Sequence, residues 1–156
     1  MKLINLLTNN KRLLQSKTIE NNLNQILSST IDNIPTDQWD NFSLNICALN
    51  KIIAIKAFYE AEGKLISFDP EENGNDITMK IKTLREEMYK ASPNKGAWYM
   101  AMFTVMNNGH FDSSFDYDNK PEFKYEPSKD KFLDDLNVFP RQEELIPEWL
   151  KEIVKS

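Results

Sequence analysis

The segment from Ala97 to Asp118 constrains the fold most, because it holds two alternating stretches on either side of one strong turn signal. Side chains from Trp98 to Met106 alternate between two faces as in a strand, and both faces are largely apolar. We therefore expect a central strand that is covered on both sides. The sequence Asn107-Asn108-Gly109 tolerates positive φ angles, as either a tight primed turn or a short bulged turn requires. The segment is predicted to form a β-hairpin.

The return arm of this hairpin separates apolar from acidic side chains. One face holds Phe111, Ser113, Phe115 and Tyr117, and the other holds Asp112, Ser114, Asp116 and Asp118. This pattern is typical of a strand with one face in the core and one face toward solvent or a partner. The predicted core includes Tyr99, Phe103, Phe111, Phe115, Tyr117, Leu84 and Met88.

Length and composition predict one soluble domain over residues 1–156, with residues 1–15 as an N-terminal extension. A chain of this size buries roughly 70% of its unfolded surface without help from a metal or a disulfide. No apolar run approaches the ~20 residues of a membrane span, so no membrane contact is expected. Polar residues interrupt the first apolar patch, so we expect no cleaved leader. The lone Cys47 fits a reducing compartment and a small strand-packing role, and the cytoplasm is the predicted location.

The charge of the chain is unevenly distributed. Its net charge is -5, and residues 97–156 alone carry 7 basic and 12 acidic side chains. Residues 1–35 carry 4 basic and 2 acidic side chains. An acidic last third disfavours direct binding of nucleic acid and favours a basic protein as partner. An acidic surface that serves only solubility is the alternative.

Two amphipathic helices are predicted on either side of the first strands. The first has a cap at Ser16 or Thr18 and is stopped by Pro35. The second has a cap at Asn75 or Asp76 and an apolar stripe that includes Leu84 and Met88. Its expected solvent face holds Lys80, Lys82, Arg85, Glu86, Glu87 and Lys90.

The remaining elements complete an α+β pattern. Residues 42–48 alternate with period two, the apolar run 52–59 follows, and a shorter strand is expected at 64–68. Together they predict an antiparallel meander with a turn at residues 60–63. Two short helices are predicted at residues 128–135 and within 141–154, where Pro147 lies early. The order α-βββ-α-ββ-αα predicts a single antiparallel sheet of about five strands with helices packed on one side.

The signatures of common enzymes are missing from the sequence. There is one histidine, His110, and the four glycines form neither a GxGxxG motif nor a P-loop. Cys47 has no neighbouring CxxC partner. We therefore predict no enzymatic activity, no cofactor and no metal site.

The carboxylates of the return arm are the one group of side chains in the sequence that could form a cation-binding or catalytic site. Asp112, Asp116 and Asp118 could hold a cation or act as an acid and base pair. An outward strand face near a sheet edge is open to water, however, and lacks the desolvation that tunes catalytic carboxylates. We therefore predict that these three residues bind a partner.

Several segments resemble the YezG-like family of bacterial immunity proteins, antitoxins that neutralise nuclease toxins. The similar pieces are IPTDQW (34–39), GAWYMAMFTV (96–105), NGHFDSSFDYD (108–118) and FPRQEELIPEWL (139–150). The resemblance covers residues 19–150 and is strongest in Gly109, Phe111, Phe115 and Tyr117. It implies an α+β fold, no catalysis and a tight complex with a cognate toxin domain. It implies no catalytic residues and does not locate the interface.

These observations support three functional hypotheses. The first is an immunity protein that binds and neutralises a cognate bacterial toxin, a basic nuclease. The alternative is a cytoplasmic secretion chaperone for an effector, which would dimerise and bind an extended segment rather than a folded domain. The third, an enzyme that uses the acidic face, ranks last.

Overall fold

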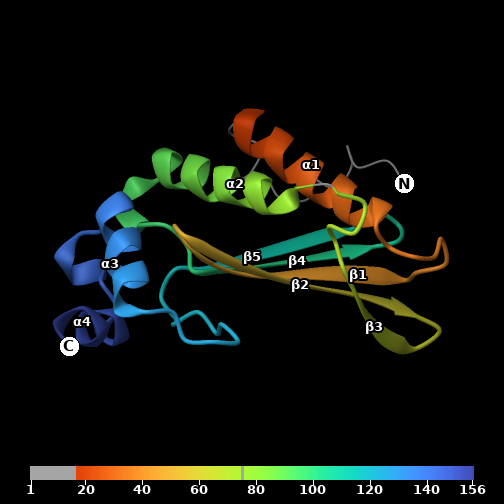
Figure 1. Ribbon diagram of the computed structural model, residues 1–156. Coiled ribbons are helices and arrows are strands. Elements are labelled where there is room, and N and C mark those ends of the chain that lie inside the picture. The colour runs from red at the N-terminus through yellow and green to blue at the C-terminus, as the bar shows by residue number, and fades with distance from the viewer. Residues whose placement is uncertain (1–16, 75) are drawn as a thin grey trace.

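The computed structural model describes residues 17–74 and 76–156, which form one five-stranded antiparallel sheet and four α-helices (Figure 1). The elements in chain order are α1 (Lys17–Asp32), β1 (Asn41–Leu49), β2 (Ile52–Ala61), β3 (Lys64–Phe68), α2 (Ile77–Ala91), β4 (Met100–Met106), β5 (Phe111–Asp116), α3 (Lys129–Val138) and α4 (Glu148–Lys155). Two short 3-10 helices are η4 (Pro93–Lys95) and η5 (Glu143–Leu145). This order confirms the predicted α+β fold. The predicted N-terminal extension and the Ser16 cap lie outside the described residues.

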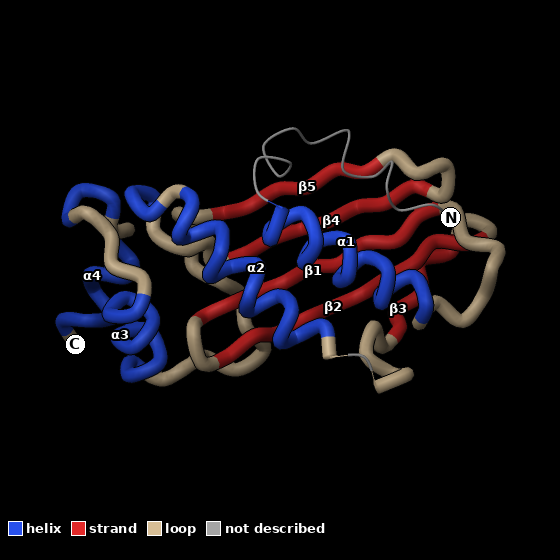
Figure 2. The backbone as a smooth tube through the Cα atoms, turned by 90° about the horizontal axis from the view of Figure 1, so that it is seen from above, coloured by secondary structure: helices blue, strands red, loops and turns tan. Residues whose placement is uncertain are grey.

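The sheet has the strand order β3-β2-β1-β4-β5. Helices α1 and α2 lie across one face of the sheet, and α3 and α4 stand at one of its ends (Figures 1 and 2). Helix α2 carries the chain from the β3 edge to β4, which pairs with the central strand β1. Asp76 caps α2, because its carboxylate accepts the Met79 N–H at 3.1 Å, as predicted.

The predicted hairpin between β4 and β5 forms, and its turn is the bulged alternative. The Gly109 N–H donates to the Met106 carbonyl at 2.9 Å, and the Met106 N–H donates to the His110 carbonyl at 2.8 Å. Of these turn residues only Gly109 has a positive φ, of 92°. The β2–β3 turn is shorter than predicted, because Glu62 and Gly63 both adopt positive φ and reverse the chain in two residues.

The main core lies between the sheet and the two helices above it. The register places Phe42 opposite Val105 and Leu44 opposite Phe103, with all four side chains buried. Leu23, Ile26 and Leu27 of α1 and Ile77, Ile81 and Leu84 of α2 meet this layer. Of the predicted core, Leu84, Tyr99, Phe103 and Phe111 are buried, and Met88, Phe115 and Tyr117 are partly buried against the core.

The expectation that β4 is covered on both faces is wrong. Ala101, Phe103 and Val105 are buried, whereas Met102 is 47% exposed and Met106 is 37% exposed. The reason is the placement of the last two helices. They pack at the end of the sheet instead of forming a second layer beneath β4 (Figure 1).

A second buried cluster holds these helices at the end of the sheet. Its buried members are Leu49, Tyr99, Phe132 and Leu150. Helix α3 continues to Val138, beyond the predicted end at residue 135. Helix α4 is shorter than the predicted 141–154 segment and begins directly after Pro147, whose carbonyl accepts the Leu150 N–H at 3.1 Å.

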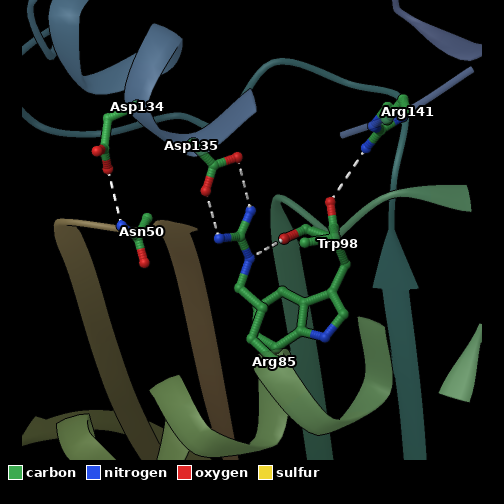
Figure 3. A network of polar contacts seen from close by, with 7 residues as sticks. Asn50, Arg85, Trp98, Asp134, Asp135 and Arg141 are labelled. Carbon is green, nitrogen blue, oxygen red and sulfur yellow. Dashed lines mark hydrogen bonds and ion pairs between the residues drawn. The ribbon is translucent and has the colours of Figure 1, made fainter. Parts of the chain in front are cut away.

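Arg85 is buried, which corrects its predicted place on the solvent face of α2. Its side chain is 2% exposed. Its two Nη atoms donate to the Asp135 carboxylate at 2.5 and 3.1 Å, and its Nε donates to the Trp98 carbonyl at 2.6 Å (Figure 3). The Phe139 ring centroid lies 5.0 Å from the guanidinium carbon. This bidentate ion pair joins α2, the approach to β4, and α3.

Removal of one partner of this ion pair should lower the stability of the fold. We expect Asp135→Ala to lower the free energy of unfolding by about 3 to 5 kcal/mol, because it leaves the Arg85 charge buried without its counterion. The matched control is Asp130→Ala, an exposed carboxylate in the first turn of the same helix, with an expected loss of at most about 1 kcal/mol. Urea unfolding measures the loss of stability in both variants, and equal losses would contradict a buried ion pair between Asp135 and Arg85.

Gly96 permits a close approach by Arg141. It has a φ of 78°, and a Cβ atom there would lie 2.8 Å from the Arg141 Cδ and closer still to its Cγ and Nε. The Arg141 Nη2 donates to the Ala97 carbonyl at 3.0 Å, and the guanidinium lies 4.8 Å from the Tyr99 ring centroid. The backbone at Gly96 is thus part of the binding site of the Arg141 side chain.

Gly96→Ala should therefore destabilise the fold more than an alanine at another left-handed glycine. We expect a loss of about 2 to 4 kcal/mol for Gly96→Ala, because backbone strain is added to displacement of Arg141. Gly63 has a similar φ of 74° and nothing within 4 Å of its added Cβ. Gly63→Ala should lose only about 1 kcal/mol. Thermal unfolding of both variants tests the difference, which should vanish if Arg141 packs elsewhere.

Candidate interaction surface

The face of the sheet opposite α1 and α2 is the largest candidate for a binding surface. The register assigns to it the odd-numbered residues 41–47 and 65–67 and the even-numbered residues 52–60, 100–106 and 112–116. We call this set the open face. Within residues 17–74 and 76–156, no helix lies over its centre (Figure 1).

Methionine side chains line the part of the open face that β4 contributes, beside the central strand β1. Met100, Met102 and Met106 all point to it from β4. Met102 and Met106 are exposed, and Leu65 at the β3 edge is 67% exposed. Single exposed apolar side chains are normal on protein surfaces, but several on one sheet face form a patch.

The open face carries more acid than base. Its carboxylates are Glu60, Asp112 and Asp116, and its single ammonium group is Lys56. The surface therefore combines exposed methionines on β4 with negative charge on the neighbouring edge strand β5. This combination fits a protein partner with exposed basic groups.

The three predicted site residues differ in their surroundings. Asp112 has a side chain that is 76% exposed, with Oδ2 at 3.3 Å from Nε2 of His110. The Asp116 carboxylate accepts the N–H groups of Asp118 and Asn119 at 3.0 and 2.9 Å and the Asn119 amide at 2.8 Å. These hydrogen bonds, chiefly those from Asn119, hold the pKa of Asp116 below its ordinary value.

Asp118 does not belong to the strand row in which it was predicted. Strand β5 ends at Asp116, whose carboxylate closes the turn that follows. Asp118 is exposed, and its carbonyl accepts the Trp149 Nε1–H at 2.7 Å. The structure thus brings Asp112 and Asp116 onto one face and leaves Asp118 beyond the end of the strand.

A hollow of about 690 Å³ opens at the turn end of the sheet. It is lined by Gln38, Trp39, Asp40, Glu62, Met106, Asn107 and Asn108. Asn107 fixes one wall, because its Nδ2 donates to the Trp39 carbonyl and its N–H donates to the Asp40 carbonyl, both at 2.8 Å. The hollow adjoins the open face through Met106. Sequence reasoning missed it, since its acidic residues Asp40 and Glu62 lie on different turns.

The opposite end of the open face is closed by the segment that follows β5. The Cys47 Sγ donates to the Glu122 carbonyl at 3.6 Å, and Phe123 packs against the second cluster. Burial raises the pKa of the Cys47 thiol, which favours its protonated and less nucleophilic form. Cys47 is partly buried at this end of the open face, and its predicted strand-packing role stays a prediction.

In the part of the chain that the structure describes, no three His, Cys, Asp or Glu side chains gather in a way that could hold a metal ion. No helix among the described residues has the length and apolar character needed to cross a membrane.

Comparison with models of protein families finds no match for this chain, and no curated protein is detectably similar to it in sequence. The resemblance to the YezG-like family therefore stays a prediction.

The Asp116 turn generates a pH-dependent prediction. A carboxylate with a lowered pKa stabilises the fold above its ordinary pKa of 3.8 and loses that contribution as pH falls through its lower folded value. We expect Asp116→Ala to cost roughly 1 kcal/mol at pH 7 through lost hydrogen bonds. The difference from wild type should shrink below pH 4. Urea unfolding of wild type and Asp116→Ala at pH 7 and at pH 3 measures this difference, and a loss of stability that is equal at both pH values would contradict it.

Proposed function

We propose that this protein is an immunity protein of the bacterial cytoplasm, which binds a cognate toxin domain and blocks its activity without catalysis of its own. The observation that carries this proposal is the open face, which presents exposed methionines beside an excess of carboxylates. A face that residues 17–74 and 76–156 leave uncovered in this way is suited to bind another folded surface.

A basic nuclease is the proposed class of toxin. A nuclease binds polyphosphate through a positively charged surface, and an acidic protein can occupy the same surface. The net charge of -5 speeds the encounter with a basic partner at low salt. Asp112 and Asp118 are the predicted contacts that remain exposed, whereas Asp116 is engaged in its own turn.

The direct test is neutralisation of a toxin by the full chain. The candidate is the toxin domain encoded by the reading frame next to this gene, produced with and without this protein. We expect co-expression to restore growth, and the purified protein to suppress nuclease activity in vitro at a 1:1 ratio. A dimer that leaves the folded toxin active and binds only an extended effector segment would favour the secretion chaperone instead.

A double substitution tests the electrostatic part of the proposal. We expect Asp112→Asn with Asp118→Asn to weaken toxin binding by about 10-fold at low ionic strength and to flatten its salt dependence, because close charge pairs are lost. Calorimetric titration at two salt concentrations measures both effects.

The matched control removes the same charge from the other side of the molecule, through Glu86→Gln with Glu87→Gln on α2. It should leave affinity within about twofold of wild type, because only weak long-range attraction is lost. Equal losses in both double variants would mean that net charge, rather than these aspartates, governs binding.

A further inference from the structure

We infer that the methionines of β4 form the centre of the toxin-binding surface, and that the partner meets them with an apolar patch ringed by Lys and Arg side chains. This inference rests on the proposed function and identifies the contact that the carboxylates alone do not provide. The occupant is a folded basic domain, docked flat on the open face.

The geometry of β4 supports a contact made by side chains. Strand β4 is paired on both sides, with β1 and β5, so its backbone is engaged within the sheet. Met102 lies between Asn45 and Ser114 in the register, and both neighbours have shorter side chains. The thioether of Met102 therefore projects from the sheet.

The chemistry of methionine suits this position. Its unbranched, polarizable side chain adapts to irregular apolar surfaces and is common at binding surfaces. Three of the six methionines in the sequence share this one strand face. A central apolar contact surrounded by polar and charged side chains is the usual organisation of a protein interface.

The size of the open face also fits a domain. Five strands at about 4.8 Å spacing and seven residues at about 3.3 Å give a face of roughly 20 by 23 Å. A standard interface of about 800 Å² per partner would cover it and reach its rim. At the turn end that rim is the hollow with Asp40 and Glu62, which adds two carboxylates beside Met106.

Charge decides between the candidate occupants. A second copy of this chain would bring together two faces that each carry Glu60, Asp112 and Asp116 against the single Lys56, and so two faces of net negative charge. Like charges that face each other across an interface are unfavourable, whereas Lys and Arg of a basic domain would complement them. The open face is therefore assigned to a basic partner.

Methionine methyl NMR tests this assignment on the full chain. The probe is the catalytically inactivated toxin domain encoded beside this gene, titrated into protein labelled with ¹³C at its methionine methyl groups. We expect the signals of Met100, Met102 and Met106 to shift or broaden. Met79 is the internal control, because it is 56% exposed on α2 at the other side of the sheet. Movement of Met79 alone would overturn the inference.

Matched substitutions test the energetic role of the same residues. We expect Met102→Lys to weaken binding of this toxin domain by about 100-fold, and Met79→Lys to change it less than about twofold. Met106→Lys serves as the second variant if Met102→Lys fails to fold, as judged by thermal unfolding. Normal affinity in folded Met102→Lys or Met106→Lys protein overturns this inference but leaves the proposed function standing.

Two further outcomes separate the two proposals. If the wild-type protein does not bind the toxin domain, both the proposed function and this inference fail. If sedimentation shows a wild-type dimer that Met102→Lys dissociates, the open face belongs to a second copy of the chain, and the inference about a basic partner is wrong.

Discussion

The buried ion pair between Arg85 and Asp135 joins helix α3 to α2, and the same guanidinium binds the approach to β4. The guanidinium satisfies both oxygens of the carboxylate and the Trp98 carbonyl, so its desolvated charge is compensated. Because these partners come from α2, from the approach to β4 and from α3, the pair sets where the last two helices stand. The second hydrophobic cluster then packs around that position. The fixed geometry of a bidentate pair restricts the placements of α3 that bring its carboxylate to the buried arginine.

This placement has a consequence for the sheet. Because α3 and α4 occupy its end, they do not form a layer against the open face, and the methionines of β4 remain accessible. The segment after β5 covers only the Cys47 end of that face. One face of the sheet is therefore covered by α1 and α2, whereas the open face is ordered by the hydrogen bonds between neighbouring strands. The backbone of the open face is already ordered by strand pairing, which lowers the conformational entropy lost when a folded toxin binds.

The acidic side chains of the protein would affect binding in two ways, by long-range attraction of a basic partner and by direct contacts at the open face. Net charge attracts a basic partner over roughly a Debye length, about 8 Å at physiological ionic strength, and so affects the rate of encounter. Contacts at the open face would instead govern how long the complex lasts. The Asp116 carboxylate has a structural role instead, because it accepts the N–H groups of the turn that follows β5. A row of aspartates in a sequence can thus contain both a structural hydrogen-bond acceptor and exposed contact residues.

The sequence by itself determined the element types, their order and the inward side chains of the hairpin, because periods of 2 and 3.6 residues are local properties of the chain. It also located the Asp76 cap and the turn at Gly109. Periodicity reports which side chains share a face, but it does not report whether another element covers that face. For this reason Arg85 was assigned to solvent and Met102 to the interior, and both assignments were wrong. Their environments depend on α3, which supplies Asp135 from 50 residues further along the chain. Burial at these two positions was decided only when distant segments packed together.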